Sequence, residues 1–63
     1  MDIKLDLGKK HISMLRAELA HMRCEARISI DDPKHPEIVT IRGIKDKEQR
    51  GLANQGFNIL EEA

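Results

Sequence analysis

The chain has 63 residues, of which 40% are hydrophobic, 35% charged and 2% aromatic. A chain of this length predicts a single domain, residues 1–63, whose core comes from aliphatic side chains. Its 11 basic and 11 acidic residues cancel, which argues against a dedicated binder of nucleic-acid phosphates. One cysteine excludes an internal disulfide, and no apolar run approaches the roughly 18 residues of a membrane span. We therefore expect a cytoplasmic protein without a leader sequence or a membrane partner.

The first half of the chain predicts a strand, a helix and a second strand. Residues 2–7 alternate strictly between apolar and charged side chains, as a half-buried strand does. From about Lys10 to Glu25 the apolar residues recur three or four positions apart, which predicts an amphipathic helix with Ser13 as its N-cap. Alternation returns over residues 26–30 and predicts the second strand.

The second half predicts a loop, a third strand and a closing helix. Pro33 and Pro36 exclude a paired strand between them, so this segment forms a loop. Residues 38–42 are rich in β-branched side chains and predict a strand that pairs with the second one as an antiparallel hairpin. Asp46 with Gln49 resembles a capping box and predicts a helix that continues through the C-terminal segment, with a break at residues 54–56 as the alternative.

This order of elements predicts an α+β fold, in which a three-stranded sheet carries both helices on one face. We expect the second strand to lie between the other two. A domain of this size buries only about 60% of its unfolded surface, so a protein partner or a homodimer is expected to add stability. The predicted core consists of Ile3, Leu5, Leu7, Leu15, Leu19, Met22, Ile28, Ile30, Val39, Ile41, Leu52, Phe57 and Leu60.

Catalytic chemistry finds little support in the sequence. His21 and Cys24 lie three positions apart on the predicted first helix, where an imidazole can activate a thiol. However, no glycine-rich oxyanion loop accompanies them, and the spacing of the three histidines and the cysteine matches no zinc site. A phosphate-binding GK[ST] motif is also missing. We expect no enzymatic activity, no cofactor, no metal and no small-molecule substrate.

The exposed side of the predicted first helix carries a charge pattern. Its two flanks would be a basic edge of Lys9, Arg16 and Arg23 and an acidic edge of Glu18 and Glu25. Between them lie small or soft groups of the kind that pack against a partner, at Met14, Ala17, His21 and Cys24. We predict that this outer stripe is a partner interface and that the charged edges help to dock it. An ordinary solvated helix surface is the alternative.

The order of elements, with MDIKLDLGKK at the start and IRGIKDKEQR before the last helix, resembles the DinI-like proteins of bacteria and their phages. Those small proteins bind the recombinase RecA and modulate the DNA-damage response, through an acidic last helix that imitates the phosphates of single-stranded DNA. The resemblance implies a non-enzymatic regulator or inhibitor that acts by protein contact on a DNA-repair or recombination protein. By position, the acidic docking residues would be Asp46, Glu48, Glu61 and Glu62.

A KH-like nucleic-acid-binding module is the alternative function. The segments ARISI and IVTIRG, the loop between them and a closing helix resemble the second half of a KH domain. KH domains grip the nucleic-acid backbone with a GxxG loop between two helices, and here Gly8-Lys9-Lys10-His11 has histidine at the last position. The chain also lacks exposed aromatic side chains for base stacking, so we expect at most weak binding of nucleic acid through Lys9, Lys10, Arg16 and Arg23.

Overall fold

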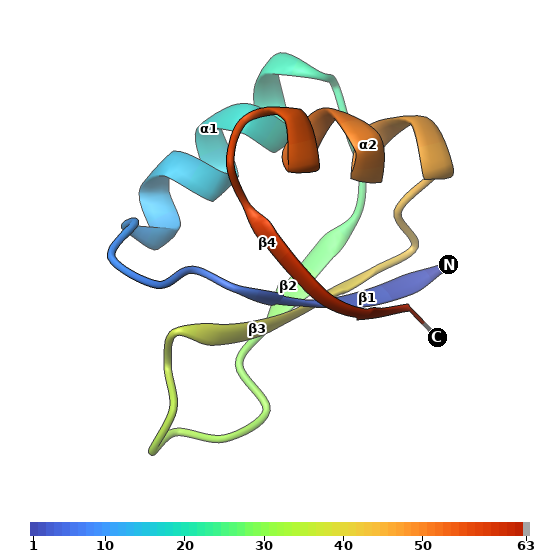
Figure 1. Cartoon of the computed structure of the whole chain (residues 1–63). Coiled ribbons are helices and arrows are strands. Elements are labelled where there is room, and N and C mark those ends of the chain that lie inside the picture. The colour runs from blue at the N-terminus through green and yellow to red at the C-terminus, as the bar shows by residue number, and fades with distance from the viewer. Residues whose placement is uncertain (63) are drawn as a thin grey trace.

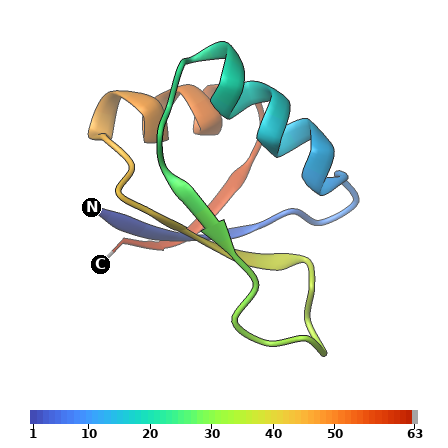
Figure 2. The ribbon, with the colours of Figure 1, turned by 180° about the vertical axis from the view of Figure 1, so that it is seen from behind.

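The computed structural model describes residues 1–62, which form two helices packed on one face of a sheet (Figure 1). In chain order the elements are β1 (Asp2–Asp6), α1 (Ile12–His21), β2 (Arg27–Ser29), β3 (Ile38–Arg42), α2 (Asp46–Asn54) and β4 (Asn58–Glu62). The view from behind shows the same two layers, with the loop between β2 and β3 extending beyond the sheet (Figure 2). The four strands are antiparallel and lie in the order β2-β3-β1-β4, which is a split βαβ topology.

The predicted α+β class is confirmed, but the sheet has four strands rather than three. The prediction that α2 continues through the C-terminal segment is wrong, because the chain turns at Gly56, whose φ is +89°. Gly56 N donates to Ala53 O and Phe57 N to Leu52 O, both at 3.1 Å. This pair of hydrogen bonds is a Schellman motif, which ends a helix with a residue in the left-handed conformation. Residues 58–62 then run antiparallel to β1 as the fourth strand.

The position of the second strand also differs from the prediction. β3 lies between β1 and β2, with Ile3 opposite Ile41 and Ile28 opposite Ile41 on its other side. The connection through α1 carries β2 past one strand position to the edge of the sheet, and the hairpin brings β3 back to fill that position. The predicted hairpin between residues 26–30 and 38–42 is confirmed, whereas the second strand is an edge strand.

The core lies between the sheet and the helices and contains most of the predicted residues. Ile44 was missed: it is 1% exposed and exchanges two backbone hydrogen bonds with Met1, at 2.9 and 3.0 Å. Ile30 and Leu60 are exposed, contrary to the prediction. Ile30 lies beyond the end of β2, and Leu60 is the extra residue of a β-bulge in β4. The buried hydrophobic residues are Ile3, Leu5, Leu7, Leu15, Leu19, Val39, Ile41, Ile44, Leu52 and Phe57.

The first helix is shorter than predicted at both ends. Its N-cap is His11 rather than Ser13, since Ser13 N donates to His11 Nδ1 at 3.2 Å. At the other end Arg23 adopts a φ of +55°, and Arg23 N donates to Ala20 O while Cys24 N donates to Leu19 O. Both helices therefore end in the same Schellman motif. The motif places Cys24 beyond the helix and turns the chain toward β2.

The second helix begins at the predicted residue, Asp46, but with a different cap. Lys45 is the N-cap, and its backbone N–H donates to Glu48 Oε1 at 3.0 Å. The predicted pairing of Asp46 with Gln49 is thus displaced by one position. The helix packs closely against the end of α1, because a Cβ on Gly51 would lie 2.9 Å from Met22 Sδ. Glycine at this interior position lets the two segments approach.

Candidate protein-interaction site

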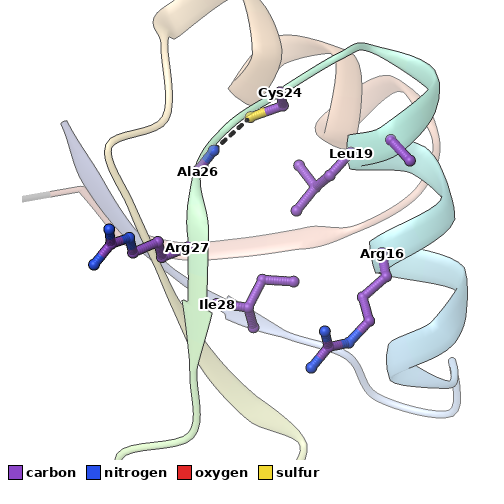
Figure 3. Close-up of a pocket in the computed structure, with 7 residues that line it drawn as sticks. Arg16, Leu19, Cys24, Ala26, Arg27 and Ile28 are labelled. Atoms are coloured by element: carbon purple, nitrogen blue, oxygen red, sulfur yellow. Dashed lines mark hydrogen bonds between the residues drawn. The ribbon is translucent and has the colours of Figure 1, made fainter.

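An open groove of about 540 Å³ runs between α1 and β2 at the edge of the sheet (Figure 3). In Figure 3 Ile28 points from β2 toward α1, and Arg16 extends from α1 toward β2. Arg27, the next residue along β2, points away from α1 to the open face of the sheet. We call this hollow the α1–β2 groove; it is lined by Arg16, Leu19, Ala20, Cys24, Ala26, Arg27 and Ile28.

The hydrogen-bond pattern of β1 and β3 shows which way the backbone of β3 faces. Leu7 N donates to Glu37 O at 2.7 Å, one position beyond the last paired residues of the two strands. Hydrogen-bonded pairs alternate along an antiparallel ladder, so the pair of Ile3 and Ile41, four positions further, is also a hydrogen-bonded pair. Ile41 therefore directs its N–H and C=O toward β1.

The same alternation leaves the outer side of β2 unpaired. The neighbours of Ile41 in β3 direct their backbone groups toward β2, where Arg27 and Ser29 lie opposite them. Ile28, between these two residues, must then direct its N–H and C=O out of the sheet. Since β2 is an edge strand, the N–H and C=O of Ile28 point outward from the free edge of the sheet, beside the groove.

Cys24 lies at one end of the groove. Its Sγ accepts a hydrogen bond from Ala26 N at 3.5 Å, which occupies the backbone donor two residues before Ile28. Burial raises the pKa of the Cys24 thiol, and the Glu48 carboxylate adds to the effect. A thiol with a raised pKa stays protonated near neutral pH, which is the opposite of what a nucleophile requires. His21 is exposed at the last position of α1.

Positive charge flanks the groove on both faces of the sheet. Arg27 lies directly opposite Arg42 in the ladder, a like-charge pair that is unfavourable in a sheet. Arg42 is compensated, because its guanidinium lies 3.6 Å from Asp2 and 3.8 Å from Asp31. Among the described residues, neither Arg27 nor Arg16 forms an ion pair. The edge of the sheet therefore presents two uncompensated guanidinium groups.

A polar cluster on the open face fixes β2 to β3. Thr40 Oγ1 donates to Asp31 Oδ2 at 2.6 Å, and Ser29 Oγ donates to Asp31 Oδ1 at 3.3 Å. These hydrogen bonds, the first of them above all, lower the pKa of the Asp31 carboxyl, and the positive charges of Arg42 and Lys4 contribute. Thr40 is buried although it faces away from the helices. The inner side of β2 is thus tied down while its outer side is free.

The predicted outer stripe is only partly assembled. Met14, Ala17 and His21 are exposed on α1, as expected of a surface that faces away from the core. Cys24 does not join them, because α1 ends at His21 and the Cys24 side chain packs against the core. The structure therefore brings three of the four residues of the predicted interface together.

The predicted basic edge is not a continuous feature of α1. Arg16 is on the helix and lines the α1–β2 groove, whereas Lys9 precedes the helix and Arg23 follows it. Arg23 instead borders a second hollow of about 520 Å³ near the start of α2, together with Lys45 and Glu48. The three residues of the predicted edge thus lie in separate surroundings.

The predicted acidic residues are also divided between elements. Asp46 Oδ2 forms an ion pair with Arg50 Nε at 2.9 Å on α2, and Glu48 caps the start of the same helix. Glu61 lies on β4, where it is exposed, and the side chain of Glu62 lies outside the described part of the structure. These carboxylates do not share one helix face.

Of the residues that line the groove, the sequence predicted Arg16 and Cys24 as partner contacts, but it did not reveal that Ala20, Ala26, Arg27 and Ile28 join them. Alternation placed Ile28 in a strand facing the core, which is correct, since its side chain packs against the core cluster. The missing information was the edge position of β2, which depends on strand order and leaves no local signal in the sequence.

Among the side chains that the structure describes, residues 1–61, no three His, Cys, Asp or Glu groups lie close enough together to hold a metal ion. No helix in that range has the length and apolar character needed to cross a membrane. Comparison of the chain with protein-family models, curated proteins and solved structures found no match.

Proposed function

We propose that the protein is a small non-enzymatic module that regulates a partner protein by contact, through an extended partner segment that pairs with β2. The observation that carries the proposal is the unpaired backbone of Ile28 beside the α1–β2 groove. In recognition by strand addition, main-chain hydrogen bonds supply affinity and neighbouring pockets supply specificity. β2 has only 3 residues, so the contact belongs with weak, transient interfaces.

The two edges of the sheet are not equally receptive, which supports β2 over β4 as the docking edge. In β4 the register shifts between the partners of Lys4 and Leu5, and Leu60 bulges out of the ladder. A bulge twists an edge strand and interrupts its row of hydrogen-bonding groups, which protects it from pairing with another chain. β2 has a regular register with β3 along its whole length.

Nucleic-acid binding has less support than protein binding. The open face of the sheet carries carboxylates at Asp2, Asp6 and Glu61 beside its basic residues, and these would repel phosphates. The one aromatic side chain, Phe57, is 6% exposed in the core and offers no stacking platform. A single helix lies between β1 and β2, where the KH-like alternative needs two. From the DinI-like resemblance we infer that the target class is a DNA-repair or recombination protein.

The proposal is tested by affinity capture from host lysate with matched variants, with and without nuclease. Ala20→Glu places a charged side chain in the α1–β2 groove, and Ala17→Glu makes the same change on the outer stripe of α1. Both residues are exposed, so both variants should fold, as circular dichroism would verify. We expect a protein that the wild type retains after nuclease treatment to be lost with Ala20→Glu and kept with Ala17→Glu.

The reverse pattern would move the interface to the outer stripe. Partners that disappear on nuclease treatment of the wild type would contradict the proposal and favour the nucleic-acid alternative. Retention of the same partner by both variants would show that α1 takes no part in binding.

A further inference from the structure

We infer that the segment docked on β2 is an acidic peptide with alternating apolar and carboxylate side chains, supplied by another protein. The inference rests on the proposed docking at β2 and adds the chemistry of the partner. Two observations point to such a peptide. A strand added to β2 would have the α1–β2 groove on one face and the helix-free face of the sheet on the other, and the charges of Arg16 and Arg27 are uncompensated.

The geometry of strand addition decides where each partner side chain lies. A strand bonded to the outward N–H and C=O of Ile28 places one residue directly opposite it, on the face that carries α1. That residue meets an apolar surface formed by Leu19, Ala20 and Ile28. The partner residues before and after that residue lie on the face of the sheet without helices, next to Arg27 and Ser29.

The positive charge of Arg27 favours carboxylates at the partner positions on the helix-free face of the sheet. Arg27 already faces the like charge of Arg42 across the ladder, and the nearby carboxylates of Asp2 and Asp31 pair with Arg42 rather than with Arg27. A carboxylate on the added strand, opposite Arg27, would compensate this charge from the free side. Arg16 extends over the groove from α1, on the opposite face of the added strand, and adds to the positive potential that attracts an acidic segment (Figure 3).

A second copy of the chain fits this edge less well. Pairing of β2 with β2 of another copy would bring the Arg16 and Arg27 side chains of both chains to one seam. The groove itself is lined by no carboxylate that could compensate them. A foreign acidic segment meets the same backbone without adding positive charge, which is why we choose it as the occupant.

The experiment is a titration of isotope-labelled protein, followed by amide chemical shifts, with two synthetic heptapeptides. One peptide alternates glutamate and valine, and the other alternates lysine and valine. We expect the glutamate peptide to bind at least about tenfold more tightly, with the largest shifts at Ile28 and along the groove. Arg27→Glu should reverse the preference, whereas Lys34→Glu, the same charge change in the exposed loop between β2 and β3, should leave it unchanged.

The remaining outcomes separate the two proposals. Equal binding of both peptides at Ile28 would leave docking at β2 intact and overturn the acidic partner. Absence of shifts at Ile28 with either peptide would overturn docking at β2 itself. Two further results would overturn the acidic partner: dimer formation through β2 in sedimentation runs, or tighter binding of oligothymidine than of the glutamate peptide at Arg27.

Discussion

The molecule contains the same strand–helix–strand unit twice, and the two units differ in the residue at which the chain turns after the helix. The first unit is β1-α1-β2 and the second is β3-α2-β4. Each helix ends in a Schellman motif, with Arg23 at φ +55° in the first unit and Gly56 at φ +89° in the second. The motif is present at Arg23 although a side chain disfavours the left-handed conformation. The fold therefore requires the turn back to the sheet at this position.

The units also differ in the strands that follow these turns. In the second unit β4 pairs over five residues with a bulge, and in the first β2 pairs over three and leaves Ile28 open. The unfavourable turn at Arg23 and the short edge strand therefore occur in the same unit, which is also the one that carries the α1–β2 groove. The second unit holds the more regular turn and the protected edge.

The largest effects are expected where the two units are alike. Leu15 in α1 and Leu52 in α2 are each fully buried, so Leu15→Ala and Leu52→Ala should each lower the free energy of unfolding by about 2–5 kcal/mol. Urea denaturation followed by circular dichroism measures both. Met14→Ala, on the exposed side of α1, is the control and should change stability by less than about 0.5 kcal/mol. A much smaller loss for one leucine would show that the two helices do not share the core equally.

The next largest effect is expected when the turn residue of the second unit is replaced by that of the first. Gly56→Arg should cost about 1–2 kcal/mol, because a side chain disfavours the left-handed conformation. A Cβ at this position would lie 3.7 Å from Lys10 Nζ, an ordinary contact, so the cost comes from the backbone rather than from a clash. Thermal unfolding of the variant should show a lower midpoint. An unchanged midpoint would mean that the turn adapts to either residue.

The reciprocal exchange should stabilise the protein. Arg23→Gly relieves the left-handed strain but increases the conformational entropy of the unfolded chain, for a net gain of roughly 0.5–1 kcal/mol. Arg23→Ala is the matched control, because it removes the charge and keeps the Cβ. If alanine stabilises as much as glycine, the arginine charge rather than the turn is responsible.

The contrast between the units also explains which features the sequence reveals. The alternation of β1, the β-branched run of β3 and the start of α2 are local signals, and all three elements lie at or near their predicted positions. β4 was not predicted, because the spacing of Phe57, Ile59 and Leu60 suits the apolar side of a helix as well as a strand. Strand order depends on how α1 crosses the sheet, so neither the edge position of β2 nor the α1–β2 groove could be predicted.

The smallest effect is expected at Asp31, in the loop that joins the two units. Its carboxylate accepts hydrogen bonds from Thr40 in the second unit and Ser29 in the first, which lower its pKa below the usual 3.8. A group with a lowered pKa in the folded state adds stability above pH 3.8 and loses it as the pH falls through the folded pKa.

Asp31→Asn should therefore lower stability slightly at neutral pH, and its difference from the wild type should shrink as the pH falls below about 3.8. The loss is small because the carboxylate is exposed and solvent screens it. Urea denaturation at a series of pH values measures the difference. Thr40→Val removes the main donor, so Asp31→Asn should have little further effect in that background. A constant difference between Asp31→Asn and the wild type across this pH range would show that Asp31 acts through the shape of the loop and not through its charge.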